Sequence, residues 1–316
     1  MANYDIIIIG GGLSGNMMAK RAMTLLPNAS IAIIDKGDCV DHSFHLHRPI
    51  EELNLPWVKH NFFLGVWDGA MRSNITPKDV NDYAYKVYGK LQPSNICNFN
   101  HQQGSEIYPV TKSVLMNVLS NDATNIKAEV KLVNTEEKFI ETLGLRHHYK
   151  YLINTISLPT FLMLCGIKTT LPFVNHRFNV HTLSLGYSSG LYQMIYNTKK
   201  FGANITRVTL IDDTIYVESL ADEYWKADKE MIADNFGVSL AGAPIKISPG
   251  RFDPLPREDR KNLYYHLTNQ YNILLLGRYG SWTFKVANSV WDDTKLLCEI
   301  INQRENTAKG AMICKP

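Results

Sequence analysis

The chain has 316 residues, enough for one or two domains at roughly 150 residues each. Hydrophobic residues make up 45% and charged residues 20%, proportions typical of a folded globular protein, which excludes a disordered chain. The formal net charge of +3 permits an anionic substrate, but no block of lysines and arginines indicates a nucleic-acid-binding tail. No run of apolar residues is long enough to cross a bilayer, so we expect no membrane partner.

The N-terminal 35 residues have the pattern of a βαβ unit. Tyr4–Ile9 ends in four consecutive isoleucines, which predicts a strand buried on both faces. Apolar residues recur at helical spacing over 13–26, and Pro27 ends that helix. Ser30–Ile34 predicts a second buried strand, and Asp35 stands at its end.

The turn inside this unit reads Gly10-x-Gly12-x-x-Gly15, the dinucleotide-binding fingerprint. Gly10 permits the tight turn, Gly12 lets a pyrophosphate approach backbone N–H groups, and Gly15 lets the helix lie close to the strand. The helix N-terminus adds partial positive charge. Asp35 can accept hydrogen bonds from an adenosine ribose, which argues against a 2′-phosphate. We place three neighbouring residues beside the same cofactor: Leu13, Ser14 and Lys36.

The five cysteines are odd in number and scattered, without a CxxC pair. They are Cys39, Cys97, Cys165, Cys298 and Cys314. This pattern predicts neither a disulfide framework nor a zinc site and is typical of a protein of the reducing cytoplasm.

The middle of the chain is less regular than its start. A helix is predicted over Thr76–Leu91, with Thr76 as N-cap and Pro77 as the first helical residue. The pattern favours β-structure over three further segments: Ala128–Val133, Tyr149–Thr155 and residues 171–247.

Near the C-terminus, Ile273–Leu276 predicts a buried strand that leads into the turn GRYG at 277–280. A helix over about Val290–Asn302 follows, with Ser289 and Asp292 at capping-box spacing. No second glycine fingerprint is found, so we expect no dedicated NAD domain. The first fingerprint by itself does not distinguish NAD from FAD.

Three stretches together resemble the group of FAD-dependent amine oxidases, protoporphyrinogen oxidases and UDP-galactopyranose mutases. They are the N-terminal βαβ unit, the mid-chain YLINTISLPTFL and the late ILLLGRYGSWTF with its following helix. The resemblance covers about half of the chain and implies FAD as the cofactor. The chain departs from the group at Asp35, where glutamate is usual, and at DHSFHLHRP, which replaces an Arg/Gly-Gly stretch. Its brevity would fit a short bacteriophage member.

The resemblance implies an α/β fold, in which a Rossmann-type FAD-binding domain with a parallel sheet carries an inserted mixed α+β substrate domain. The FAD-binding domain would comprise residues 1–50, 121–165 and 266–316. Residues 51–120 would form a mainly helical substrate or cap part, and residues 166–265 a β-rich substrate domain.

The resemblance also implies where the cofactor lies. In the group, the middle strand passes near the flavin, and the late strand ends in a Gly-Asp or Gly-Arg pair that faces the ribityl-pyrophosphate. The last helix aims its N-terminus at the isoalloxazine. The corresponding cofactor contacts here are Val130, Thr155, Gly277 and Arg278. Arg278 could neutralise the pyrophosphate or the charge on a reduced flavin.

Candidate catalytic residues are fewer. His45, His47 and Arg48, with nearby His42, could orient a substrate or transfer a proton near neutral pH. Two histidines at i, i+2 could also hold a metal, but no third ligand has suitable spacing, so we expect no metal; structural hydrogen bonding is the alternative. Trp282 is predicted to wall the flavin ring together with Phe284, or else to pack in a core.

Three further groups of residues have weaker signals. Lys285 could contact the flavin, although an exposed structural lysine is the alternative. Tyr187, Tyr192 and Tyr196 fall where a substrate lid would form or are core aromatics. The basic group of Arg251, Arg257, Arg260 and Lys261 could meet a phosphate-bearing substrate or form a solvated loop face.

The leading hypothesis is an FAD-dependent oxidoreductase that oxidises a C–N bond, giving an imine that water then hydrolyses. A narrower form places the substrate on a modified thymine base or nucleotide of phage DNA, in a host cytoplasm. One alternative is a redox-neutral mutase acting on a nucleotide-sugar, with Arg278 and Arg251 or Arg177 binding the diphosphate. The other is a dinucleotide-binding protein without turnover. The sequence leaves the oligomeric state open.

Overall fold

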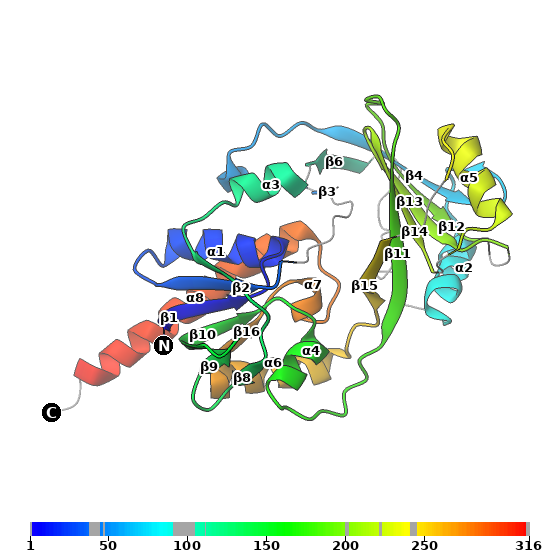
Figure 1. The fold of residues 1–316 in the computed structure, drawn as a ribbon. Helices are drawn as coiled ribbons and strands as arrows, with labels where there is room; N and C mark the ends of the chain where they lie inside the picture. Colours follow the sequence, from blue (N-terminus) through cyan, green and yellow to red (C-terminus); the bar gives the residue numbers. More distant parts are fainter. Residues whose placement is uncertain are drawn as a thin grey trace.

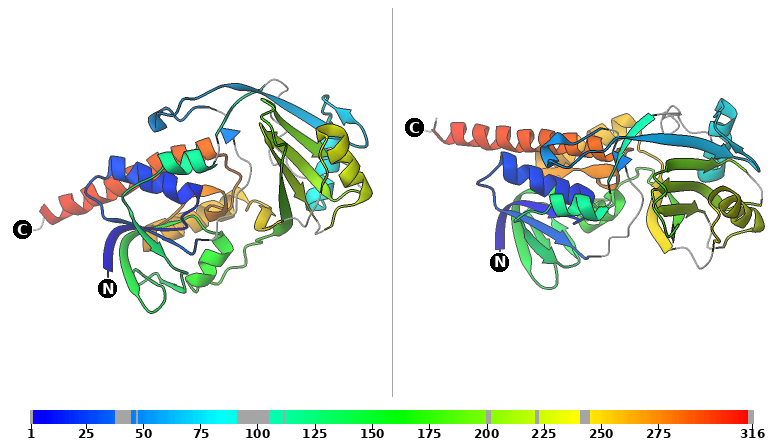
Figure 2. Two further views of the ribbon diagram at one scale, coloured as in Figure 1. Left: turned by 45° about the horizontal axis from the view of Figure 1, so that its top comes forward. Right: turned by 90° about the horizontal axis from the view of Figure 1, so that it is seen from above.

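The computed structural model describes residues 2–37, 45–46, 48–90, 105–110, 112–199, 202–220, 223–240 and 245–313. They form two bodies, each built on one sheet (Figure 1). Figure 2 shows from two further directions that the bodies lie side by side, with the long helix α8 (Ala287–Ile313) running along the first body and away from the second. Within this described part, no helix is long and apolar enough to span a membrane.

The first body contains a seven-stranded sheet whose core is parallel. In spatial order its strands are β7 (Thr124–Lys127), β2 (Ile31–Asp35), β1 (Ala2–Ile9), β10 (Arg146–Asn154), β9 (Phe139–Glu141) and β8 (Leu132–Asn134), and β16 (Ile273–Leu275) also pairs with β10. β1 runs parallel to β2 and β10, β10 runs parallel to β16, and β2 runs parallel to β7. The carboxyl ends of these strands therefore meet at one edge.

Helices cover both faces of this sheet, which explains the run of isoleucines in β1. On one face of the sheet, Ile6 and Ile8 pack against the helices α1 (Leu13–Leu25), α3 (Lys112–Val118) and α8. Ile7 and Ile9 pack on the other face, against α4 (Leu158–Leu164) and α6 (Arg257–Tyr271). Since β1 is buried on both faces, an alternating polar pattern would leave polar groups in a core. The predicted βαβ unit and the α/β fold class are confirmed.

The second body is a nine-stranded, mainly antiparallel sheet. Its order is β15 (Ile245–Phe252), β11 (Asn175–Ser184), β14 (Thr214–Ser219), β13 (Ile205–Ile211), β12 (Tyr192–Asn197), β4 (His60–Trp67), β6 (Ser105–Pro109) and β3 (His45–Leu46), and β5 (Met71–Arg72) pairs with β4. Only the β12–β4 pair among these is parallel. Two helices pack on this sheet, α2 (Pro77–Tyr88) and α5 (Lys226–Phe236).

α2 begins as the sequence predicts. Thr76 is the N-cap, Pro77 is the first helical residue, and a capping box joins Thr76 to Asp79. The helix ends at Gly89, whose φ of 69° is in the left-handed region that favours glycine. Residues 51–120 also supply β4, β5 and β6 to the second sheet and the short 3-10 helix η1 (Glu51–Leu53), which the sequence pattern does not predict.

Two expected boundaries are wrong. α8 begins at Ala287 rather than near Val290, because the Val290 N–H already donates to the carbonyl of Val286; Ser289 is therefore inside the helix and is not its cap. The strand expected over 128–133 is only partly formed: residues 128–131 connect β7 to β8, and β8 begins at Leu132. The Ala128 N–H still bonds to the Asp35 carbonyl at the end of β2, and the chain then enters the β8–β9 hairpin.

Candidate functional site

Three loops meet at the carboxyl edge of the seven-stranded sheet. They follow β1, β10 and β16, and the third is the one-turn helix α7 (Gly277–Gly280). Thr155, just after β10, donates its hydroxyl to the carbonyl of Ile9 at 2.7 Å, and so ties the middle loop to the end of β1. A crevice outside the carboxyl ends of parallel strands is the usual ligand site of such a sheet.

The glycine turn after β1 is as tight as the fingerprint predicts. Gly10 has a φ of 103°, and a Cβ there would lie 2.4 Å from the Thr155 hydroxyl oxygen. A Cβ on Gly15 would lie 1.9 Å from the Gly10 carbonyl oxygen, so only glycine lets α1 start this close to the strand. Gly12 is the N-cap of α1, and no side chain caps the helix or puts an acid in its first turn. This N-terminus is suited to an anion.

Asp35 lies beside this turn, at the end of β2. Its Oδ2 accepts the Gly11 N–H and its Oδ1 accepts the Gly37 N–H, each at 2.5 Å. The carboxylate is therefore fixed between the two loops and keeps lone pairs for ribose hydroxyls. Lys36 follows it on the surface. Val130 lies in the connection between β7 and β8 and packs at the margin of the core that includes residues of β1 and β2.

α7 packs against both of the other loops. Gly277 has a φ of 78°, and a Cβ there would lie 2.4 Å from the Ser14 hydroxyl oxygen. A Cβ on Gly280 would lie 2.4 Å from the Asn154 carbonyl oxygen. The predicted cofactor residues at 10–15, Thr155 and 277–278 are thus brought together from three distant parts of the sequence, and Leu13 anchors the start of α1 in the core.

Arg278 lies on α7 at the boundary with the second body. Its guanidinium carbon is 5.0 Å from the centroid of the Phe284 ring and 5.4 Å from that of Phe252, which comes from β15. Its Nε is buried and has no hydrogen-bond partner, and no ion pair joins Arg278 to a carboxylate of the described residues. A buried donor without a partner costs about 1–3 kcal/mol, and an anionic group at this place would remove that cost.

Trp282 does not lie on an open face, which favours the alternative that it packs in a core over the prediction that it walls the flavin ring. Its side chain is 0% exposed and packs against Phe173 and Phe252, with ring centroids 5.2 and 4.6 Å away. Its indole N–H donates to the carbonyl of Asp253 at 2.9 Å. The indole that suggested a wall of the cofactor site thus connects the two bodies.

The histidine-rich segment is only partly described. His42 and His47 lie outside the described residues, and for His45 only the backbone is described, paired in β3 with Pro109. Arg48 donates from one nitrogen to both oxygens of Asp292, at 2.6 and 2.7 Å, and its carbonyl accepts the side-chain amide of Asn288. Arg48 is therefore bound to the first turns of α8.

Lys285 is bound in the same way. Its amine forms an ion pair with Asp293 of α8, so its charge is already compensated. Arg48 and Lys285 thus both hold the N-terminal turns of α8 in place. The sequence analysis considered them as contacts of a substrate or of the flavin.

Sequence reasoning missed a buried ion cluster in the second sheet. Glu218 of β14 accepts hydrogen bonds from Arg207 of β13 and from Arg251 of β15, the latter at 2.8 Å. Burial alone would raise the pKa of Glu218, but the two guanidinium groups outweigh it and hold that pKa below its ordinary value. The Arg251 guanidinium lies 5.4 Å from the ring of Tyr83 on α2. No spacing in the sequence signals this cluster, because its members come from three strands.

The other predicted residues are spread over the second body and α6. Tyr196 is buried against Tyr83, Tyr192 lies against His60, and Tyr187 is 63% exposed. Arg260 of α6 donates to the hydroxyl of Thr283 at 2.9 Å. Arg251 is buried apart from the α6 residues Arg257, Arg260 and Lys261, so the four do not form one basic patch. The Arg177 side chain lies outside the described residues.

Comparisons with solved structures agree with this architecture. A reduced UDP-galactopyranose mutase superposes with a TM-score of 0.63 at 14% identity, over 96% of both chains. A putative protoporphyrinogen oxidase from Exiguobacterium sp. 255-15 gives a TM-score of 0.65 at 12% identity, over 96% of this chain and 99% of that one. PqsL of P. aeruginosa in complex with 2-aminobenzoylacetate gives 0.59 at 11%, over 97% and 88%.

The chain has the Rossmann-type fold of these structures. No family model and no curated protein sequence matches it. The resemblance drawn from three stretches of sequence therefore extends to the fold of nearly the whole chain.

Proposed function

We propose that this protein is a flavin-dependent enzyme that binds FAD at the edge where the three loops meet. The observation that carries the proposal is the unpartnered, buried Nε of Arg278. It lies on the loop whose Gly277 packs against Ser14, beside a glycine turn and an uncapped helix N-terminus that are suited to an anion. Bound FAD would supply reversible transfer of two electrons at its ring.

The residues of this chain fit the parts of that cofactor. The turn from Gly10 to Gly15 and the N-terminus of α1 would bind the pyrophosphate, and Asp35 the adenosine ribose. Arg278 would balance negative charge on the cofactor, because a guanidinium is always charged. The rings of Phe252 and Phe284, stacked with centroids 5.4 Å apart, would help exclude water beside it.

For the reaction, we propose oxidation of a C–N bond: the amine would lose a hydride to bound FAD and a proton to water, and water then splits the resulting imine into a carbonyl compound and an amine. Oxygen or another external acceptor would take the two electrons. The support is the single dinucleotide fingerprint, which leaves no NAD-binding domain in the sequence to reduce the flavin. The substrate class we favour is a small amine or an amino group on a nucleotide, including a modified thymine of phage DNA.

A redox-neutral mutase is the second candidate, favoured by the likeness to UDP-galactopyranose mutase over 96% of both chains. Such an enzyme needs cationic groups for the diphosphate of a nucleotide-sugar. Arg278 would meet this need. Of the two candidates for the second arginine, Arg251 is buried against Glu218, and the side chain of Arg177 lies outside the described residues. The mutase candidate therefore depends on Arg177 for its second cation.

The test begins with the visible spectrum of the purified protein. We expect the absorption of oxidised flavin and FAD in the heat-released supernatant; a colourless protein without extractable FAD would contradict the proposal. Anaerobic bleaching by a secondary amine supports oxidation, whereas conversion of a UDP-sugar only after reduction by dithionite supports the mutase. FAD that binds but reacts in neither assay identifies a non-catalytic binding protein.

Gly12→Val tests where the pyrophosphate lies. The Gly12 φ of −70° is open to any residue, so valine should leave the fold intact while its side chain fills the phosphate space. We expect the variant to melt near the wild-type temperature once both are stripped of FAD, but to retain less than about a tenth of the FAD. Thr24→Val, exposed at the far end of α1, is the control and should retain FAD fully.

A further inference from the structure

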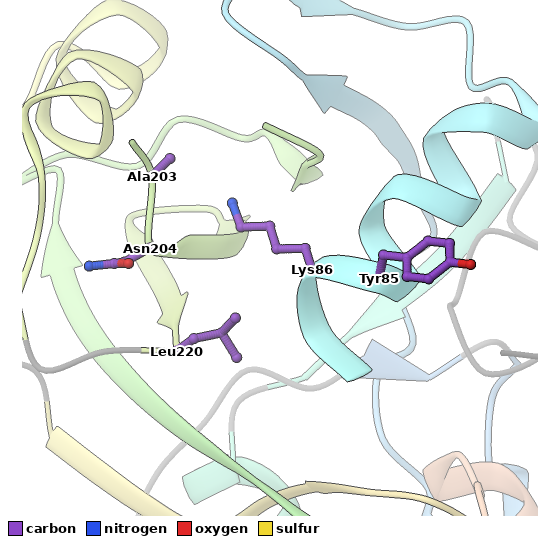
Figure 3. Close-up of a pocket in the computed structure, with 5 residues that line it drawn as sticks. All are labelled: Tyr85, Lys86, Ala203, Asn204 and Leu220. Carbon is purple, nitrogen blue, oxygen red and sulfur yellow. The ribbon is translucent and has the colours of Figure 1, made fainter. Parts of the chain in front are cut away.

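A cavity of about 520 Å³ lies in the second body, between α2 and the start of β13. It is lined by Tyr85, Lys86, Ala203, Asn204 and Leu220 (Figure 3). Figure 1 places α2 and α5 at the opposite end of the molecule from α1, so this cavity is separate from the proposed cofactor site.

Lys86 is the polar group that enters the cavity. Figure 3 shows its side chain extending from α2 toward the strand at Ala203 and Asn204, whereas the side chains of Tyr85 and Asn204 point elsewhere. The Lys86 amine donates to the carbonyl oxygen of Ile205 at 2.7 Å. An ammonium has three N–H groups, and the described part of the chain offers Lys86 only this acceptor and no ion pair.

Two charged side chains act on Lys86 from a distance. Asp228 attracts the ammonium, while its carboxylate oxygens accept the backbone N–H groups of Asn204, Ile205 and Trp225. Lys199 adds a second positive charge. Burial, with the repulsion of Lys199 and against the attraction of Asp228, lowers the Lys86 pKa to about 8. At neutral pH the amine is therefore still mostly charged, and no carboxylate of the described residues forms an ion pair with it.

The lining also includes apolar groups, beside the polar residues Tyr85 and Asn204. Leu220 points into the space in Figure 3, and Ala203 contributes a methyl group. Trp225, half-exposed, lies next to this segment, 3.8 Å from where a Cβ on Gly202 would stand. A ligand that suits these walls has one negatively charged group for the amine and a small apolar body.

We propose that the Lys86 cavity binds the anionic group of a small molecule, a carboxylate or a phosphate, independently of the cofactor site. The Lys86 ammonium donates its remaining hydrogen bonds to the anion's oxygens, and Leu220 and Ala203 contact the body of the ligand. Charge-assisted hydrogen bonds of this kind are about twice as strong as neutral ones.

Benzoate and inorganic phosphate are the probes, each titrated by calorimetry at pH 7 into the protein as purified. We expect at least one of them to bind the wild type, and to bind Lys86→Met about tenfold or more weakly, because methionine keeps the stem and removes the charge. Lys86→Arg should retain most of the affinity. Lys78→Met, an exposed lysine of the same helix, is the matched control and should bind like the wild type.

Raising the pH gives an independent readout. Because the pKa of Lys86 is lowered to about 8, the amine loses its charge above that pH, and the wild type should bind about tenfold more weakly at pH 9.5. Binding by benzoate alone identifies an organic carboxylate site, and binding by phosphate alone a phosphate site.

Two results would overturn the proposal: no binding of either probe to the wild type at millimolar concentration, or equal binding by Lys86→Met and the wild type. Benzoate that changes the visible spectrum of bound flavin, and does so equally in Lys86→Met, would be assigned to the cofactor site. Neither failure affects the proposed flavin chemistry, since the two sites share no residue.

Discussion

Glu218 binds both arginines of the buried ion cluster in the second sheet. Glu218, Arg207 and Arg251 are all at least four-fifths buried in their side chains, so their charges interact in a region of low dielectric. Removing the charge of Glu218 takes from both guanidinium groups a carboxylate that they bind. Because an uncompensated buried charge is costly, the carboxylate of Glu218 matters more for stability than a surface acid.

Glu218→Gln should therefore lower the free energy of unfolding by about 3–5 kcal/mol, measured by urea denaturation at pH 7. Glu230→Gln is the control: Glu230 is exposed and pairs only with Lys226 along α5, so its loss should cost less than about 0.5 kcal/mol. An equal, small effect of the two changes would show that the cluster is solvated.

The pH dependence follows from the direction of the shift. Since folding lowers the pKa of Glu218 below its ordinary value of 4.5, the group contributes stability above that value, and the contribution is lost as the pH falls through the folded-state pKa. The wild type should accordingly lose its advantage over Glu218→Gln progressively below pH 4.5, and the two should converge in acid.

At the scale of single elements, α2 depends on a reciprocal pair of hydrogen bonds at its start. The Thr76 hydroxyl accepts the Asp79 N–H at 3.4 Å, and the Asp79 carboxylate accepts the Thr76 N–H at 2.8 Å. Arg72 fixes that carboxylate from the other side at 2.6 Å. Since Tyr83 and Lys86 are on this helix, its first turn also positions the ion cluster and the Lys86 cavity.

Thr76→Ala should lower the free energy of unfolding by about 1 kcal/mol, because one N–H of the first turn loses its acceptor. Thr76→Ser keeps the hydroxyl and should recover most of the loss in urea denaturation. Lys78→Ala, exposed in the same turn, is expected to change the stability by no more than about 0.5 kcal/mol. If serine fails to restore the stability, packing of the threonine methyl group, rather than capping, holds the helix end.

The elements that the sequence predicts well are those decided by neighbours along the chain. The isoleucines of β1, the glycine turn and the cap at Thr76 each carry their own signal within a few residues. β4 and β6 do not, because they are stabilised by pairing with each other across about forty residues of sequence. The start of α8 was missed for a related reason: a plausible cap at Ser289 competes with helical hydrogen bonds that begin at Val286.

For the whole molecule, the glycine-rich loops at the carboxyl edge of the first sheet could be predicted from the sequence, but the ion cluster of the second sheet could not. Gly10, Gly15 and Gly277 can be recognised in the sequence, because only glycine fits where two segments approach this closely. Arg207, Glu218 and Arg251 are ordinary charged residues in their own strands, and only the antiparallel order β15-β11-β14-β13 brings them together. An aromatic residue is equally ambiguous in sequence, since Trp282 suits a ligand wall or a core.

The side chain of Trp282 connects the two bodies. It follows α7 of the first body, packs against Phe252 of the second sheet, and donates to the carbonyl of Asp253. The Asp253 carboxylate accepts from His176 at 3.0 Å and pairs with Lys90, so the loop after β15 is held from several directions. Loss of the indole N–H would leave one buried carbonyl without this donor.

Trp282→Phe should lower the free energy of unfolding by about 1–3 kcal/mol, while the visible spectrum of bound flavin stays unchanged. Urea denaturation followed by circular dichroism, together with the spectrum at equal FAD content, measures both. Trp225→Phe, at a half-exposed tryptophan of the same protein, should cost less than about 0.5 kcal/mol. A variant of Trp282 with wild-type stability and a shifted flavin spectrum would instead show that the indole contacts the ring, one of the two roles that the sequence allows.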